Sequence, residues 1–129
     1  MKRGKPLKRS AMRKKPRRGG NMPPQVYEAV MRRSGYRCEA VIAGVCTGAA
    51  EEWHHRQPRD RYNDVPSNGV AICAACHRHI TDVSPRDGFD RGLRVSRHTV
   101  RPPGEFPVLL CGRRWVLLDD AGGWVYAEI

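Results

Sequence analysis

The cysteines of this chain are spaced in a way that suits a metal ion. They occur as Cys38-x7-Cys46, Cys73-x2-Cys76 and an isolated Cys111. A C-x2-C pair brings two thiolates within reach of one tetrahedral zinc ion, and the upstream pair completes four ligands. The spacing therefore predicts a closed structural Zn²⁺ site; four buried free thiols or a redox pair are the alternatives. Cys111 lies in an apolar run and is expected to be a small core residue.

The histidines lie beside these cysteines and suggest chemistry of a second kind. His54 and His55 are adjacent, His77 directly follows the last paired cysteine, and Asn68 comes nine residues before His77. Neighbouring residues on a strand point to opposite faces, so His54 and His55 are poorly placed to hold one ion together. One imidazole can bind a metal while the other does acid–base work near neutral pH. His98 is expected to be an ordinary surface or core residue.

The elements that must position these residues are short. Residues 24–34 are expected to form a helix, with Pro24 in its first turn and Gly35 as its stop. Residues 36–53 have little helical periodicity and are expected to form a metal-binding loop. Alternation and composition predict the remaining elements: strands at 53–56 and 69–73, a helix at 74–83, strands at 93–100, 107–111, 114–120 and 124–129, and a hairpin turn at 120–123. Together these elements make an α+β fold.

The charge of the chain is concentrated at its N-terminus. Residues 1–20 hold ten of the 24 Lys and Arg residues and none of the 13 acids, which leaves 14 basic against 13 acidic residues elsewhere. A one-signed segment with few apolar residues is expected to be disordered and to bind a polyanion, with a solvated tail as the alternative. We therefore predict three parts: a disordered basic arm (1–22), a domain carrying the cysteines and histidines (23–90) and a C-terminal β-hairpin extension (91–129).

In combination, the motifs resemble those of the HNH endonucleases, in the zinc-containing form found in bacteriophages. The resemblance spans roughly residues 25–83. The order of His-His, Asn and Cys-x2-Cys-His is far more specific than any one of these elements. The RRSGYRCE segment also resembles the segment that leads into the family's domain, and the PLKR tail and the WVLLDDAGGW ending are softer matches. The residues that carry the resemblance are Cys38, Cys46, His54, His55, Asn68, Cys73, Cys76 and His77.

This resemblance implies a ββα-metal (His-Me finger) core stapled by the four-cysteine zinc site. It also implies a role for each motif residue. His54 and His77 would bind a catalytic divalent cation, His55 would be the general base, and Asn68 would orient the imidazole of His55 through a hydrogen bond.

One position departs from the family's pattern. Other members often place a further ligating histidine where this chain has Thr81, and His79 should lie about 200° away around the helix. We therefore expect two histidine ligands, completed by water and substrate oxygens. An open shell of this kind suits Mg²⁺, although imidazoles also admit Mn²⁺, Ni²⁺ or Zn²⁺.

The implied activity is hydrolysis of DNA phosphodiester bonds. DNA contacts are expected from the loop after the histidines and from the arm, and the loop arginines could instead pair with Asp60 and Asp64. The resemblance also suggests work beside a phage terminase or another packaging protein. The residues assigned to DNA binding are Arg56, Arg59, Arg61, Lys8, Arg9, Arg13, Lys14 and Lys15.

Two other hypotheses belong to a different class. The chain could be a zinc-stapled DNA-binding protein without catalysis, or an RNA-binding zinc protein, and neither explains His54 and His55 beside Asn68 and His77. No apolar run is long enough for a membrane span or a secretory signal, so the cytoplasm, of a host cell if the protein is phage-encoded, is the expected location.

Overall fold

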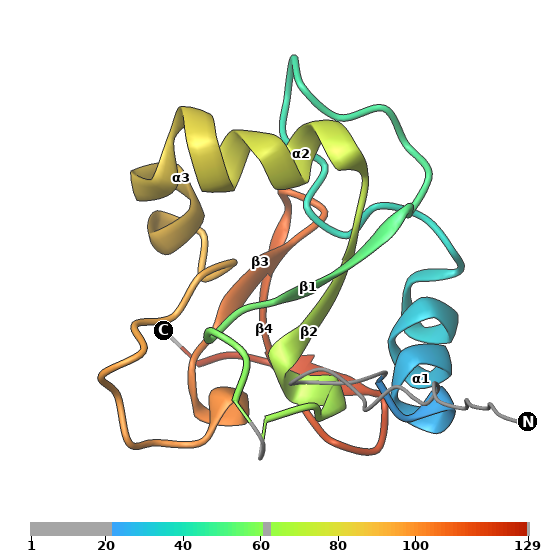
Figure 1. The fold of residues 1–129 in the computed structure, drawn as a ribbon, viewed down its shortest axis with the longest axis vertical. Helices are drawn as coiled ribbons and strands as arrows, with labels where there is room; N and C mark the ends of the chain where they lie inside the picture. Colours follow the sequence, from blue (N-terminus) through green and yellow to red (C-terminus); the bar gives the residue numbers. More distant parts are fainter. Residues whose placement is uncertain (1–21, 61–62, 129) are drawn as a thin grey trace, which may run out of the picture.

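A computed structural model describes residues 22–60 and 63–128 of the chain (Figure 1). It has mixed helices and two small antiparallel sheets. Within these described ranges, no helix is both long and apolar enough to cross a membrane. The elements in chain order are α1 (Pro24–Ser34), β1 (Glu52–His55), the 3-10 turn η1 (Pro66–Asn68), β2 (Gly69–Ile72), α2 (Ala74–Arg78), the π-helical turn η2 (His79–Val83), α3 (Pro85–Asp90), the 3-10 turn η3 (Pro103–Glu105), β3 (Val108–Leu110), β4 (Arg114–Leu118) and β5 (Trp124–Tyr126).

The predicted first helix is confirmed as α1. It begins with proline, whose fixed φ suits a first turn, and it ends at Gly35, which has a left-handed φ of 66°. Val30 and Met31 are its buried residues and pack with Ala71 of β2. The apolar face of α1 therefore attaches the helix to the hairpin that carries the histidines.

A buried ion pair strengthens this attachment. Arg33 of α1 donates from Nε and Nη2 to the two carboxylate oxygens of Glu39, each at 2.8 Å, and Nη2 also donates to the carbonyl of Gly69. Glu39 in turn accepts from the backbone N–H of Ala71. Because both charged side chains are buried, these hydrogen bonds compensate for their desolvation.

The two strands predicted around the histidines are confirmed as β1 and β2, which pair antiparallel with His54 opposite Val70 and His55 opposite Gly69. All four residues of β2 are buried. The helix expected over 74–83 is also confirmed, but its second half, η2, is π-helical. Figure 1 shows α2 crossing above the β1–β2 pair and leading directly into α3.

One expectation about the second half of the chain is wrong. Residues 93–100 do not form a strand: Leu93 and Val95 alternate toward the core, but residues 96–98 are exposed and no neighbouring strand pairs with this segment. Apolar alternation cannot make a strand without a partner for its backbone groups. The helix α3 was not expected. Its signal was Ser84, which caps the helix by accepting from the N–H of Asp87, followed by Pro85 in the first turn.

The remaining strands form a three-stranded sheet in the order β3-β4-β5. The predicted hairpin turn is confirmed, since β4 ends at Leu118, β5 begins at Trp124 and the two pair antiparallel. This sheet shares a core with the first half of the chain. The buried residues of this common core are Cys38, Ala40, Ile42, Val70, Ile72, Cys73, Cys76, Ile80, Leu93, Val108, Leu110, Val116 and Leu118.

Candidate metal centres and histidine site

The four paired cysteines lie together at the start of α2. Their sulfur atoms all lie within 4.8 Å of one another, and Cys38, Cys73 and Cys76 are buried. Four sulfurs around a tetrahedral zinc ion at about 2.3 Å would be separated by about 3.8 Å, so the cluster has the dimensions of such a site. It can hold a metal ion such as zinc. Cys111 is a separate, partly buried thiol.

Backbone N–H groups point at the sulfurs of this cluster. Thr47 and Cys76 donate to Sγ of Cys73, at 3.4 and 3.3 Å, and Gly48 donates to Sγ of Cys46. Burial raises the pKa of the Cys73 thiol, but hydrogen bonds with Thr47 and Cys76 outweigh it and set the pKa at about 6. Burial raises the pKa of Cys46. The N–H groups therefore stabilise the thiolate charge that a metal requires of its ligands.

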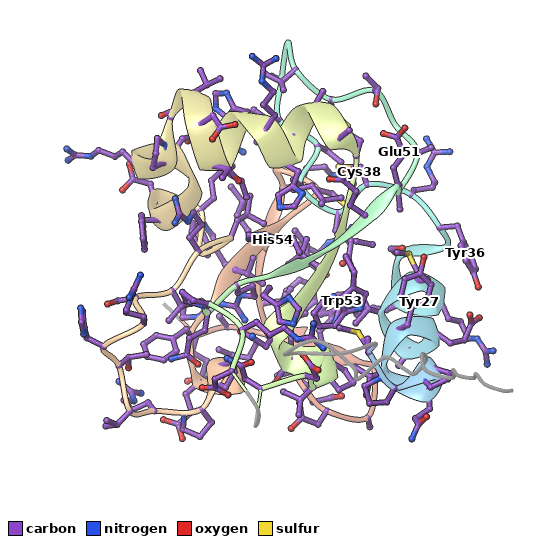
Figure 2. All side chains as sticks on the ribbon, in the orientation of Figure 1. Tyr27, Tyr36, Cys38, Glu51, Trp53 and His54 are labelled. Atoms are coloured by element: carbon purple, nitrogen blue, oxygen red, sulfur yellow. The ribbon has the colours of Figure 1, made fainter. Side chains whose placement is uncertain are left out.

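The histidine pair of β1 is divided between two faces, as strand alternation predicts. His54 is buried and meets His77 of α2, with ring centroids 4.8 Å apart, whereas His55 contacts Trp53 and Asp64. Figure 2 shows His54 near the centre of the molecule and Trp53 on the side of α1. His54 and His55 thus have separate partners.

The facing nitrogens of His54 and His77 define a second candidate centre. Nδ1 of His54 lies 3.2 Å from Nε2 of His77. The outer nitrogens are both engaged: Nε2 of His54 lies 2.7 Å from the carbonyl oxygen of Leu93, and Nδ1 of His77 bonds to the carboxylate of Glu52. Carbonyl and carboxylate oxygens accept hydrogen bonds, so each outer nitrogen carries a proton.

With its proton on Nε2, a neutral His54 presents the lone pair of Nδ1 to Nε2 of His77. Burial lowers the pKa of His54 to about 3, so its ring is neutral at physiological pH. This lone pair can accept a hydrogen bond from Nε2 of His77, or both facing nitrogens can bind one cation. Metal-binding histidines almost always donate their other N–H to a carboxylate or a carbonyl, which is the arrangement of His54 and His77. This donor set fits a divalent cation.

The sequence did not reveal the outer partners of these rings. Glu52 had a signal: it lies two residues before His54, and residues two apart on a strand share a face. Nothing in the sequence indicated Leu93, because its carbonyl belongs to a residue 39 positions after His54.

The residues after His77 do not add a third imidazole to this centre. Thr81 donates its hydroxyl to the carbonyl of His77 at 2.7 Å, and His79 pairs with Asp87 of α3 at 3.0 Å. The expectation that His79 lies off the metal-facing side is consistent with this pairing.

No protein-family model, curated protein or solved structure matches the chain. The resemblance to the HNH endonucleases stands on its motif residues, and the structure places several of them in contact. His54 meets His77, and the cysteine before His77 belongs to the four-sulfur cluster.

The expected hydrogen bond between Asn68 and the His55 imidazole is wrong. Asn68 is fully buried; its Oδ1 accepts from the N–H of Gln57, and its Nδ2 donates to the carbonyls of Gln57 and Asn63. These bonds hold the two ends of the loop between β1 and β2. The partner of His55 is Asp64, whose Oδ1 lies 2.7 Å from Nε2. The sequence could not indicate this pair, because it depends on how the loop folds back.

The expected DNA contact of Arg56 is also wrong. Its side chain is 1% exposed, and its guanidinium donates to carbonyl oxygens of the surrounding loops. Burial lowers the pKa of Arg56 to about 10. A buried guanidinium with all its N–H groups directed at backbone carbonyls organises loops and cannot reach a phosphate. Those carbonyls belong to Gly92, Ser67, Pro103, Phe106 and Pro107.

The other arginines assigned to DNA binding are placed differently. Arg59 forms a two-point ion pair with Asp64, which matches the alternative of pairing within the loop. The other residues assigned to DNA binding, Arg61, Lys8, Arg9, Arg13, Lys14 and Lys15, lie outside the described residues.

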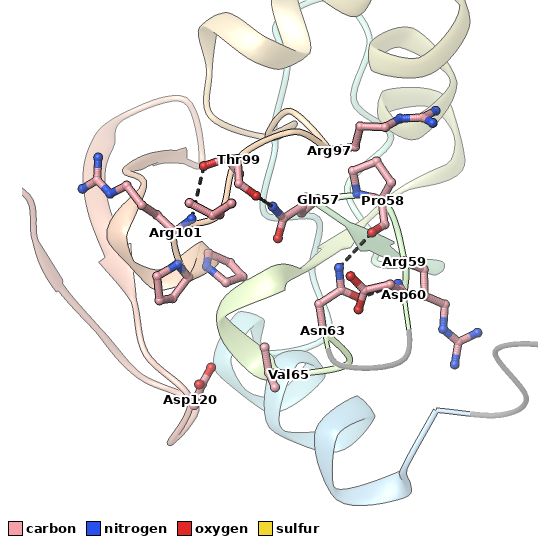
Figure 3. Close-up of a pocket in the computed structure, with 13 residues that line it drawn as sticks. Gln57, Pro58, Arg59, Asp60, Asn63, Val65, Arg97, Thr99, Arg101 and Asp120 are labelled. Atoms are coloured by element: carbon pink, nitrogen blue, oxygen red, sulfur yellow. Dashed lines mark hydrogen bonds between the residues drawn. The ribbon is translucent and has the colours of Figure 1, made fainter.

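An open pocket of about 730 Å³ adjoins the loop that follows His55 (Figure 3). Its walls come from that loop and from residues 97–103. Gln57 donates to the carbonyl of Thr99 across the base of the pocket, and Asn63 donates to the carbonyl of Pro58. Arg97 and Arg101 also line the pocket. The pocket is separate from His54 and His77, which do not line it.

Proposed function

We propose that this protein is a metal-dependent HNH endonuclease that hydrolyses DNA phosphodiester bonds. The observation that carries the proposal is the 3.2 Å contact between Nδ1 of His54 and Nε2 of His77, with His55 on the adjoining position of the same strand. A second possibility, a zinc-stapled DNA- or RNA-binding protein, provides no reason for this pair.

The arrangement of β1, β2 and α2 supports a ββα-metal core. β1 and β2 form an antiparallel pair, and α2 follows β2 after a single residue, Cys73, which caps the helix. A structural zinc bound by the cysteine cluster would hold the start of α2 in place. Because His77 directly follows Cys76, the same zinc would also fix the position of His77 opposite His54.

His54 and His77 are the residues that would hold the catalytic cation. Two imidazole ligands leave an open shell for water and phosphate oxygens, which suits Mg²⁺ and also admits Mn²⁺, Ni²⁺ or Zn²⁺. When bound, the cation would stabilise negative charge on the phosphate and on the leaving oxygen.

His55 is the proposed general base. Its Nε2 is engaged with Asp64, and among the described residues no hydrogen bond involves its Nδ1. Nδ1 is therefore the atom that would take a proton from the attacking water. A positioned general base contributes roughly 10²- to 10⁴-fold to a rate.

The basic residues 1–20 would contribute salt-dependent affinity for the phosphate backbone. The sequence holds no segment that resembles a base-reading helix, so we propose low sequence specificity. By analogy with phage HNH proteins, the activity would serve DNA packaging beside a terminase, in the host cytoplasm.

The test is nicking of supercoiled plasmid with Mg²⁺, Mn²⁺, Ni²⁺ or Zn²⁺ and with no added ion. We expect cation-dependent cleavage by the wild type, and losses of about 100-fold or more in His55→Ala and His77→Ala. His98→Ala, which changes an exposed histidine, is the matched control. Zinc content is measured for each variant. Zinc-loaded protein that binds DNA or RNA but cleaves with none of the ions would favour the binding protein instead.

A further inference from the structure

We propose that Asp64, held by Arg59, is a positioning residue for His55. It keeps the proton of the neutral imidazole on Nε2 and thereby presents an unprotonated Nδ1 to water. This inference rests on the proposed role of His55 as a general base, and it assigns to Asp64 the orienting role that the sequence suggested for Asn68.

The first part of the argument is the direction of the hydrogen bond. Nε2 of His55 lies 2.7 Å from Oδ1 of Asp64. An ionised carboxylate can only accept, so Nε2 must be the donor, and a neutral ring then has its lone pair on Nδ1. Burial raises the pKa of Asp64, but hydrogen bonds from Arg59 and His55 outweigh it and hold the pKa below its ordinary value. The carboxyl group is therefore ionised at neutral pH.

The second part is the fixed position of the carboxylate. Nε of Arg59 donates to Oδ1 at 3.0 Å and Nη2 donates to Oδ2 at 2.7 Å. This two-point contact prevents rotation of the carboxylate, because a planar guanidinium holds both oxygens at once. The side chains of His55 and Asp64 are 18% and 20% exposed, so solvent weakens these contacts less than on an open surface.

The third part is what holds the ring and the loop on their other sides. The indole of Trp53 packs against the His55 ring edge-on, with centroids 4.7 Å apart. Asn68 binds Gln57 and Asn63, which lie at the two ends of the loop that carries Arg59. Asn68 therefore acts on His55 through the loop, by placing Asp64, without touching the imidazole.

The variant that tests this is Asp64→Asn. The single amide oxygen would be taken by the Arg59 guanidinium, which can only donate, and the amide NH₂ would then face Nε2 of His55. Nε2 would become an acceptor and the proton would move to Nδ1. Asp90→Asn, at an exposed carboxylate in α3, is the matched control.

The first readout is ¹⁵N NMR of the His55 ring in the zinc-loaded full chain at about pH 8, where an ordinary imidazole is neutral. We expect the Nε2–H tautomer in the wild type and in Asp90→Asn, and the Nδ1–H tautomer in Asp64→Asn. Asp64→Ala, which adds no donor, should show a mixture of the two. An unchanged Nε2–H tautomer in both Asp64 variants would overturn the inference, whether or not the protein cleaves DNA.

The second readout is steady-state cleavage. In Asp64→Asn we expect kcat to fall about 100-fold or more, with KM changed less than about 3-fold, since the lost property belongs to the chemical step. A wild type that cleaves together with an Asp64→Asn variant of equal kcat would refute the role of Asp64 and leave the nuclease proposal intact. A wild type without cleavage would refute the nuclease proposal, and the NMR result would still decide the tautomer.

Discussion

His54 and His77 face each other through nitrogens 3.2 Å apart, and the outer nitrogen of each ring donates to a protein oxygen. Burial keeps the His54 ring neutral, so its facing nitrogen has a free lone pair. The two rings come from different elements, β1 and α2, and are 23 residues apart in sequence. A cation between them would therefore join the hairpin to the helix.

Replacing Glu52 should lower the affinity of His54 and His77 for a divalent cation without removing either imidazole. Glu52 accepts from Nδ1 of His77 and so directs the opposite nitrogen toward His54. In Glu52→Ala we expect about 10- to 100-fold lower affinity for Mn²⁺, measured by calorimetry on zinc-loaded protein. Glu105→Ala, which removes a carboxylate from an exposed ion pair, should bind as the wild type does. Equal affinity in Glu52→Ala would show that the carboxylate does not orient the ring.

Loss of the cysteine cluster should abolish the folded state. Cys73 and Cys76 belong both to the cluster and to the common core, and a structural zinc supplies roughly 10 kcal/mol or more of apparent binding free energy. We expect one zinc per chain by elemental analysis, and loss of both zinc and cooperative thermal unfolding in Cys73→Ser or after chelation. Cys111→Ser should retain both. A folded, metal-free wild type would contradict the zinc assignment.

Arg56 should matter for stability more than for DNA affinity. A lysine in its place has three donors and cannot reach every carbonyl that the guanidinium contacts. We expect Arg56→Lys to lower the free energy of unfolding by about 3 kcal/mol, measured by urea denaturation. Arg97→Lys, at an exposed arginine, serves as the control. A stable Arg56→Lys protein with weakened DNA binding would restore Arg56 as a phosphate contact.

Removing one partner of the ion pair between Arg33 and Glu39 should destabilise the folded protein. Both side chains are buried, so Glu39→Gln leaves the guanidinium without its counter-charge. We expect a loss of roughly 3 kcal/mol in the free energy of unfolding. Arg32→Ala, which breaks the exposed pair with Glu28, should leave the urea midpoint unchanged. A midpoint for Glu39→Gln close to that of the wild type would refute the proposed contribution of the pair.

Acid should destabilise the protein through His54. Burial lowers the pKa of His54 to about 3, whereas in the unfolded chain the same group titrates near 6.5. Between these values the unfolded chain binds the proton and the folded chain does not, so stability falls as the pH falls below 6.5. Between about pH 7 and pH 5.5 the loss amounts to roughly 1 kcal/mol. Urea unfolding of wild type and His54→Gln at both pH values measures it; identical losses would contradict this origin.

Local patterns in the sequence were sufficient for the elements closest to the histidines. Pro24 and Gly35 delimit α1, and the alternation of β1 separates His54 from His55. The C-x2-C spacing predicts a turn that presents two sulfurs, and Cys73 does cap α2 with its side chain. These features depend on neighbours within a few residues, where backbone geometry and side-chain type decide the outcome.

Contacts across long stretches of chain were decided only by the tertiary structure. Arg56 has the same side chain as Arg59, yet it is enclosed by carbonyls from residues up to 51 positions away, and Arg59 remains at the loop surface. Asp64 and Asn68 both follow His55 in the same loop region, and the path of the loop assigns Asp64 to the imidazole and Asn68 to the backbone. Hydrogen bonds act over about 3 Å, so their partners are known only when the path of the chain is known.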